Sequence, residues 1–114
     1  MTFTTLIHYP LNHPATEGHF EGRPIVPGVV ILEDVLRVIR SQNTLQGWNF
    51  NCDLYKLSSA KFMSPVLPGH QLEVGIVKVN TKINFECKRL PDLTVAAKGT
   101  FEFPVVDLVS VEFG

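Results

Sequence analysis

The sequence predicts an α+β fold in which an antiparallel sheet wraps around one long central helix. Two observations support this prediction. A segment with helical periodicity, residues 29–42, is followed by several long segments rich in Val, Ile, Phe, Thr and Tyr that alternate in part with period two. The 114 residues, 45% hydrophobic and 18% charged, have the composition and length of one folded domain. We therefore expect a single domain over residues 1–114.

The N-terminal elements are a strand, a loop and the helix. Residues 2–7 alternate between polar and β-prone side chains, which predicts a short strand. Residues 13–28 contain three prolines and three glycines, which predicts a loop with fixed turns. The apolar positions of the following segment cover most of a helical wheel, so we expect a buried helix that ends before Gly47. Its last turns are expected to carry Arg37 and Arg40, cations that suit the negative end of a helix dipole.

The rest of the chain is predicted to form the strands of the sheet. We expect the residues after 103 to add a further edge strand, and we expect two copies of the chain to pair edge to edge as a homodimer, because one subunit offers little to cover so apolar a helix. The four main segments predicted as strands are residues 48–63, 70–80, 82–90 and 93–103.

Charge and cysteine content exclude several classes of protein. The formal charge of −1 gives no broad basic surface, so we do not expect a nucleic-acid partner. Cys52 and Cys87 lie far apart without a CxxC pair, so we expect two reduced structural thiols and no metal site. No signal peptide or membrane span is apparent, which predicts a cytoplasmic protein.

The stretch GHFEGRPIVPGVVILE, residues 18–33, contains the residues that we expect to carry chemistry. His19 lies in a loop beside Phe20 and suits a general base at neutral pH. Glu33 follows Ile31 and Leu32, whose apolar side chains are expected to desolvate it and make it a proton donor. Gly28 heads the helix, where an unpaired backbone N–H would stabilise an oxyanion.

A base, an acid and an oxyanion donor suit the elimination of water from a 3-hydroxyacyl thioester. The base removes the proton next to the thioester carbonyl, the donor stabilises the enolate, and the acid protonates the departing hydroxyl. A simpler interpretation stays open. Arg37 lies four residues after Glu33, and an ion pair between them would keep the acid ionised. His19 would then be an ordinary loop histidine.

The same stretch resembles the active-site signature GHFPGxPIMPGVLxxE of the 3-hydroxyacyl-[acyl-carrier-protein] dehydratases of the FabA/FabZ type. A second stretch, KFMSPVLPGHQLEV at residues 61–74, is similar to the later FxxPVxPGDxL segment of that family. Together the two stretches imply the hotdog fold over residues 3–103. The Glu at position 33 resembles the FabZ branch.

The resemblance implies a role for each matching residue. His19 would be the catalytic base, and Glu33 from the other subunit of a dimer would be the acid. Gly28 would bind the thioester carbonyl, the carbonyl of Ile25 would hold the imidazole, and Phe20 and Val29 would contact the substrate. The substrate would be a 3-hydroxyacyl thioester on the phosphopantetheine of an acyl carrier protein. No cofactor or metal is expected, and the protein would be a homodimer or a higher oligomer of dimers.

Several positions depart from the family pattern. Glu21 replaces a proline, His70 replaces an aspartate, and Arg37 stands where the family has the Gln of its EAxAQ helix. The short N-terminal region, with HPA before the GHF motif, is similar to dehydratases of specialised pathways such as aryl polyene synthesis.

Two other functions remain open: a hotdog acyl-thioesterase and a non-catalytic subunit that binds an acyl group or a carrier protein. Trp48 and Phe50 are expected to pack in the core rather than to line an acyl tunnel. Four cations either meet an acidic carrier protein or belong to a solvated face; they are Arg23, Lys61, Lys88 and Arg89.

Overall fold

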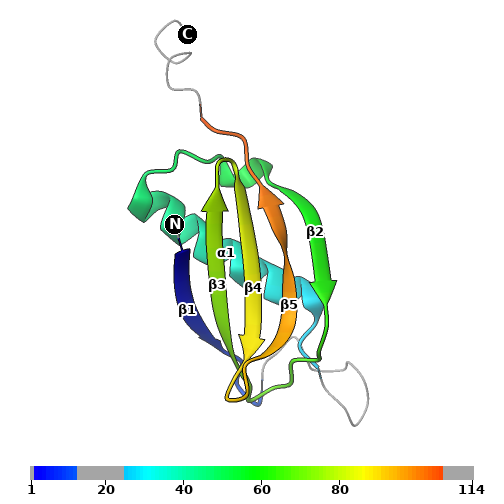
Figure 1. The fold of residues 1–114 in the computed structure, drawn as a ribbon. Coiled ribbons are helices and arrows are strands. Elements are labelled where there is room, and N and C mark those ends of the chain that lie inside the picture. Colours follow the sequence, from blue (N-terminus) through cyan, green and yellow to red (C-terminus); the bar gives the residue numbers. More distant parts are fainter. Residues whose placement is uncertain (1, 13–24, 107–114) are drawn as a thin grey trace, which may run out of the picture.

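A computed structural model describes residues 2–12 and 25–106 of the chain. These residues form one five-stranded sheet in the order β1-β3-β4-β5-β2, in which every pair of neighbours is antiparallel (Figure 1). The two edge strands are therefore β1 and β2. The strands are β1 (Thr2–His8), β2 (Lys56–Phe62), β3 (Gln71–Val79), β4 (Lys82–Arg89) and β5 (Thr94–Glu102).

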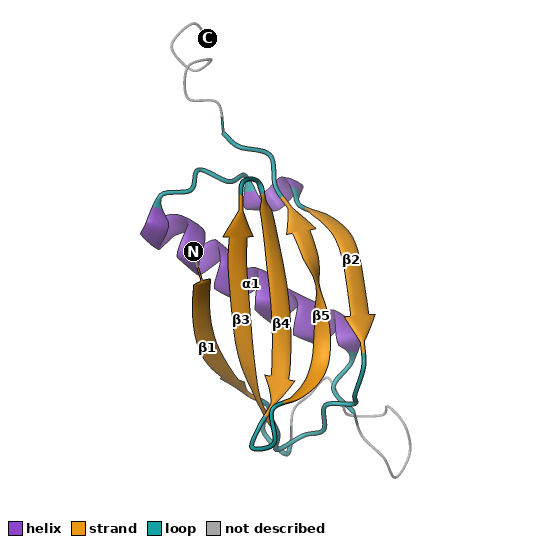
Figure 2. Cartoon of the chain, in the orientation of Figure 1, coloured by secondary structure: helices purple, strands orange, loops and turns teal. Residues whose placement is uncertain are grey.

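The long helix α1 (Gly28–Gln46) crosses one face of this sheet (Figure 2). An antiparallel sheet curved around a single long helix is the hotdog arrangement, so the predicted fold class is confirmed. Three strand predictions agree with β3, β4 and β5 to within one residue at each end, and the first strand extends one residue further than predicted.

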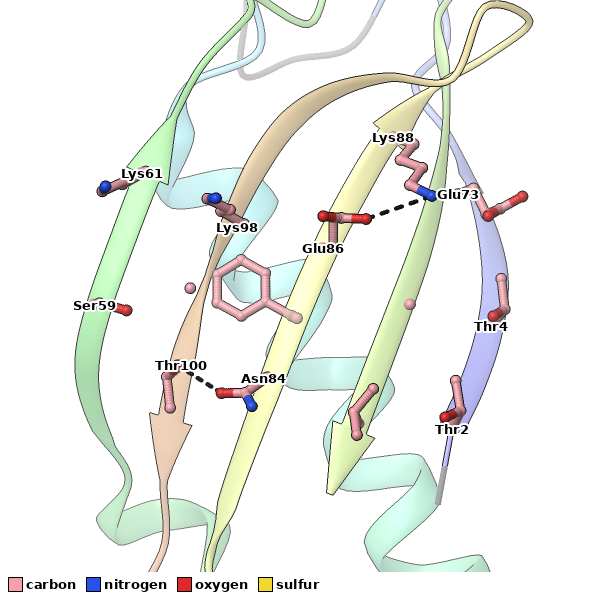
Figure 3. A pocket seen from close by; sticks show the side chains of 14 residues that line it. Thr2, Thr4, Ser59, Lys61, Glu73, Asn84, Glu86, Lys88, Lys98 and Thr100 are labelled. Carbon is pink, nitrogen blue, oxygen red and sulfur yellow. Dashed lines mark hydrogen bonds and ion pairs between the residues drawn. The ribbon is translucent and has the colours of Figure 1, made fainter. Parts of the chain in front are cut away.

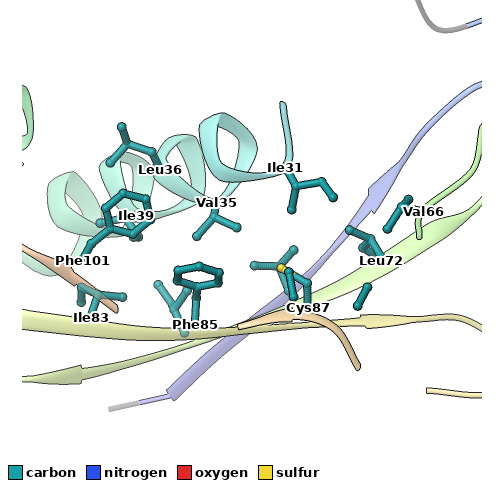
Figure 4. Packing of buried hydrophobic residues seen from close by; sticks show 14 of the residues in the cluster. Ile31, Val35, Leu36, Ile39, Val66, Leu72, Ile83, Phe85, Cys87 and Phe101 are labelled. Atoms are coloured by element: carbon teal, nitrogen blue, oxygen red, sulfur yellow. The ribbon is translucent and has the colours of Figure 1, made fainter. Parts of the chain in front are cut away.

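The core lies between α1 and the sheet, because alternate side chains of each strand point towards the helix. Leu72, Val74 and Ile76 of β3 are buried, and the buried side chains of β4 are Ile83, Phe85 and Cys87. Figure 4 shows Ile83, Phe85 and Cys87 on the side of the sheet that faces Ile31, Val35 and Ile39 of the helix. The period of two therefore assigns one face of the sheet to the core and leaves the other exposed.

Only one side of α1 enters this core. Val29 and Leu45 have 62% and 72% of their surface exposed. The buried residues of the helix are Ile31, Asp34, Val35, Leu36, Ile39 and Gln42. The expectation of a helix buried on most sides is therefore wrong for the single chain. Two apolar side chains, one near each end of the helix, are thus left exposed, while Val30, Leu32 and Val38 are partly buried against the core.

The end of the helix was predicted in part. Gly47 ends it in the left-handed conformation, with φ of 68°, and its N–H donates to the carbonyl of Asn43 at 3.0 Å. The helix continues to Gln46, however, so Arg37 and Arg40 lie in its middle turns. The expectation that they stabilise the C-terminal end of the dipole is wrong.

The segment 48–63 is not one strand. Asn49 has a positive φ of 62°, Phe50 forms an isolated bridge with Val105, and a short 3-10 helix (Cys52–Leu54) precedes β2. The side chain of Asn51 accepts a hydrogen bond from the N–H of Asp53, which closes a local turn. The expected tail strand is represented in the described chain by the bridge at Val105, and residues 107–114 lie outside the description.

Cys52 and Cys87 are free thiols, as expected, the first half-buried and the second fully buried. Phe50 packs in the core and stacks on Phe103, and Trp48 lies against it. Within residues 2–12 and 25–106, no helix is long and apolar enough to cross a membrane.

Candidate active site

A hollow of about 400 Å³ opens where α1 begins, and two of the predicted site residues, Ile25 and Gly28, line it. Its wall is formed by the two sequence stretches that carry the family resemblance. The first contributes residues around the start of α1, and the second contributes the residues that follow β2. The lining residues are Ile25, Val26, Gly28, Ile31, Phe62, Met63, Ser64, Pro65 and Val66.

Two contacts join these stretches. The N–H of Val26 donates to the carbonyl of Val66 at 2.7 Å. The ring of Phe62 lies directly over Gly28, where a Cβ atom would come within 2.7 Å of Cζ and 2.9 Å of Cε1. Glycine at position 28 allows this close approach, whereas an added Cβ would push the half-exposed ring aside, which gives a reason for a residue that is otherwise unfavourable in a helix.

The N-terminus of α1 is uncapped within the described chain. Pro27 occupies the cap position and offers no side-chain hydrogen bond, and the first turn contains no acidic residue. The N–H groups of Val30 and Ile31 donate to the carbonyl of Pro27, whereas those of Gly28 and Val29 have no acceptor among the described residues. These free donors, at the positive end of the helix dipole, can stabilise a negative oxygen.

Glu33 does not lie in the hollow of its own chain. Five residues of helix place it about 140° around the axis from Gly28, and its side chain is exposed. The expectation that Ile31 and Leu32 desolvate Glu33 is therefore wrong for the single chain: Ile31 turns into the core, while Glu33 turns towards solvent.

The alternative ion pair of Glu33 with Arg37 is also absent from the described chain. The guanidinium of Arg37 instead donates from Nη1 to Oδ1 of Asp34 at 2.9 Å. Glu33 has no hydrogen bond or ion pair with any other described residue. The arrangement that would have favoured a non-catalytic subunit is therefore not the one observed.

Asp34 is a polar site that the sequence analysis missed. It is 9% exposed, and the hydroxyl of Tyr9 donates to its Oδ2 at 2.8 Å. Burial and this hydrogen bond raise the pKa of Tyr9, so the phenol stays protonated. The local sequence gave no signal for the contact, because Tyr9 and Asp34 are 25 residues apart.

The remaining predicted site residues are Val29, which the structure describes, and His19 and Phe20, which it does not. Val29 lies beside the hollow with its side chain exposed. His19 and Phe20 lie outside the described residues, as do Glu21 and Arg23.

Among the four expected cations, Lys88 lies 3.5 Å from Glu86 and Arg89 donates to the carbonyl of Pro65, so both have partners within their own chain.

His70 has a structural role in the turn that precedes β3. Its Nδ1 accepts a hydrogen bond from the N–H of Leu67 at 2.9 Å, and its N–H donates to the carbonyl of Leu67. An aspartate, the usual residue of the resembling family here, could accept the first bond in the same way. The replacement therefore preserves the turn.

A second, larger hollow of about 640 Å³ lies on the face of the sheet opposite to α1 (Figure 3). It is lined by the outward side chains of all five strands, among them Lys61, Lys98 and Glu86. Among the described residues, none of Ile25, Gly28, Val29 and Glu33 lines this hollow, whereas Lys61 and Lys88, two of the cations considered for contact with a carrier protein, do. Elsewhere in the described chain, no group of three or more His, Cys, Asp or Glu residues lies close enough to hold a metal ion.

The sequence was compared with known protein families and curated proteins. Residues 2–100 match the ApeI-like family, described as ApeI dehydratase. The 3-hydroxyacyl-[acyl-carrier-protein] dehydratase FabZ of Ehrlichia chaffeensis is 33% identical over 100 residues, which cover 83% of this chain and 68% of that protein. FabZ of Geobacter metallireducens is 34% identical, over 68% of this chain and 54% of that protein. The chain thus spans between about half and two thirds of these two relatives.

Solved structures show the same fold. The dehydratase heterocomplex ApeI:P from Xenorhabdus doucetiae contains a chain that superposes with a TM-score of 0.69 at 22% identity, over 90% of this chain and 86% of that one. The 1,4-dihydroxy-2-naphthoyl-CoA thioesterase Slr0204 of Synechocystis superposes with a TM-score of 0.65 at 18% identity, over 95% of this chain and 84% of that one. These similarities support the hotdog architecture. The family match over residues 2–100 identifies the chain as a member of the ApeI-like dehydratase family.

Proposed function

We propose that the protein removes water from a (3R)-3-hydroxyacyl thioester carried on an acyl carrier protein, and forms the trans-2-enoyl thioester. The observation that carries this proposal is the start of α1, which no described residue caps and which opens into an apolar hollow built from both family stretches. The FabZ relatives are dehydratases of acyl-carrier-protein substrates, which supports the same carrier here.

In the proposed reaction, His19 takes the proton from C2 of the substrate. The charge that develops on the thioester oxygen is stabilised by the N–H of Gly28 and the dipole of α1. The bond between C3 and its oxygen then breaks, and Glu33 gives a proton to the departing hydroxyl, which leaves as water. The electron pair of the C2–H bond becomes the second bond between C2 and C3, and solvent exchange returns a proton to Glu33 and removes one from His19.

The other predicted residues complete the proposed site. The carbonyl of Ile25 accepts a hydrogen bond from the imidazole and so directs its free nitrogen at C2. Phe20 excludes water from the reacting carbons, and Val29 contacts the acyl chain beside the helix. The apolar lining of the hollow suits such a chain.

Glu33 acts from the partner subunit in this proposal. Its exposed position, turned away from the hollow of its own chain, supports action across an interface. The edge of β2 is unpaired in the described chain, and Val29, Phe62 and Met63 beside it are 62%, 51% and 54% exposed. A second copy that paired with β2 would cover these apolar side chains and desolvate Glu33.

The first test measures conversion of a 3-hydroxyacyl carrier thioester to its 2-enoyl form by mass spectrometry. His19→Ala and Glu33→Gln are expected to lower the rate about 10²- to 10⁴-fold, as loss of a positioned base or acid does. A thioesterase would release free thiol instead. A folded protein that binds the thioesters but leaves them unchanged would contradict the proposal.

A second test asks whether the acid acts across subunits. Equal amounts of the two inactive variants are unfolded, mixed and refolded together. A hybrid dimer then contains one site with an intact His19 and an intact Glu33 from the other chain, so about a quarter of the wild-type activity is expected to return. If the two residues act within one chain, the mixture stays inactive.

A further inference from the structure

We propose that Asp34, held by Tyr9 and Arg37, is a positioning residue that sets the direction of the neighbouring Glu33. This inference rests on the proposed function, in which Glu33 is the acid. We call the three residues Tyr9, Asp34 and Arg37 the helix brace. The brace joins the first half of α1 to the turn beside the site.

The brace satisfies a buried carboxylate completely. Asp34 lies on the buried side of α1, where an unpaired charge would be costly. One of its oxygens accepts from the Tyr9 hydroxyl at 2.8 Å and the other from Arg37 Nη1 at 2.9 Å. Because both oxygens are used, the carboxylate has one defined orientation.

Tyr9 is itself fixed in place. It is 1% exposed, its N–H donates to the carbonyl of His70 at 3.0 Å, and its carbonyl accepts from the N–H of Gly69 at 2.6 Å. The phenol therefore extends from the residue that follows β1, where the backbone is hydrogen-bonded to the turn at residues 67–70 inside the second family stretch. This side chain therefore fixes the position of the helix that carries Glu33 relative to the turn.

A contribution to stability alone explains the brace poorly. The side chain of Arg37 is 77% exposed, and ion pairs of such arginines contribute little. A buried carboxylate with partners is often no more stabilising than apolar residues of similar size.

The geometry of the helix connects the brace to the acid. Consecutive residues of an α-helix are separated by 1.5 Å along the axis and 100° around it. Fixing Asp34 against Tyr9 therefore fixes the rotation of the turn from which Glu33 projects. A reacting group displaced by about 1 Å can lose about 10²-fold in rate, so a small rotation of this turn would matter.

The test compares three variants with the wild-type protein in the dehydration assay. Asp34→Ala/Arg37→Gln removes the buried charge together with its partner, and Tyr9→Phe removes a single hydroxyl. The control, Arg40→Gln, removes another exposed cation of the same helix, one that lies 3.8 Å from Asp53. We expect kcat to fall about 10- to 100-fold in the double variant and about 3- to 10-fold in Tyr9→Phe, with KM changed less than about twofold. The control is expected to keep the wild-type kcat.

A double-mutant cycle separates positioning from a merely structural role. In a Glu33→Gln background, the brace variants are expected to lower kcat less than about twofold further, because no acid remains to be directed. Full, independent losses in that background would overturn the inference, as would wild-type kcat in folded Asp34→Ala/Arg37→Gln and Tyr9→Phe. In either case a slow Glu33→Gln would leave the proposed function standing. Wild-type kcat in Glu33→Gln itself would overturn the proposed acid and the inference together.

Discussion

The close approach of β2 and β4 to Gly99 of β5 makes this residue a sharp test of the fold. Gly99 lies opposite Ala60 of β2 on one side and Phe85 of β4 on the other. A Cβ atom at this position would lie 2.1 Å from the carbonyl oxygen of Ser59 and 2.8 Å from Cζ of Phe85. The substitution Gly99→Ala therefore forces backbone or a buried ring to move.

The size of the effect follows from these distances. An ordinary carbon–oxygen contact needs roughly 3.3 Å, so β2 would have to move away by about 1 Å. The ring of Phe85 cannot easily yield, because it is only 4% exposed within the core. We expect a loss of about 3 kcal/mol in the free energy of unfolding, at the upper end of the range for overpacked cores. For a domain of this size that corresponds to a fall in Tm of roughly 10–20 °C.

Chemical denaturation followed by circular dichroism measures this loss, and Gly75→Ala provides the matched control. Gly75 lies in the middle of β3, where the nearest atom to an added Cβ is 3.8 Å away. We expect that control to change the free energy of unfolding by less than about 1 kcal/mol. If Gly99→Ala proved as stable as Gly75→Ala, the close packing of β2 on β5 would be refuted.

Three further predictions concern the helix end and the thiols. Gly47→Ala is expected to cost about 1 kcal/mol in thermal unfolding, because φ is 68° there, and Gly47→Asn should recover part of it. Iodoacetamide should modify half-buried Cys52 before buried Cys87, which reacts only on unfolding; equal rates measured by mass spectrometry would contradict this. Burial raises the pKa of Cys87 from 9.0 to about 12, so its contribution to stability is complete below pH 9 and is lost as the pH rises towards 12. Cys87→Ala should flatten that part of the pH profile of unfolding, and an unchanged slope would count against the buried thiol.

Much of the fold could be predicted from local patterns. Period-two alternation located β3 and β4, because each of these strands has one face in the core and one in solvent. β5 was located by its β-prone composition, and its adjacent residues Ala96 and Ala97 are both buried beside a register shift. The segment 48–63 was harder, because its apolar residues belong to an irregular stretch and an edge strand rather than to one continuous strand. Asn49 and Asn51, both turn-forming residues, were the signal that marks the irregular part.

The candidate site was predictable only where its residues lie close in sequence. Gly28 and Ile25, close together in the sequence, line one hollow, and the roles expected for them stay predictions. Glu33, the partner considered for Arg37, is not the acid that Arg37 binds. Spacings of three and four residues both allow an ion pair on a helix, and the sequence does not say which acid is held. The position of the Asp34 carboxylate depends on its hydrogen bond with Tyr9, a residue that follows β1 and is brought to the helix by tertiary packing. Local sequence contains no information about that contact.

The strand order has a consequence for the time course of folding during synthesis. β1 is made first, yet Thr2 pairs with Val77 of β3, so at roughly 5–20 residues per second the strand waits about 4–15 s for its partner. The first strand pair available to the growing chain is therefore β1–β3, the β3–β4 hairpin follows, and β2 must wait for β5. The apolar face of α1 is therefore exposed through most of translation, and nascent chains are most vulnerable to association in that interval.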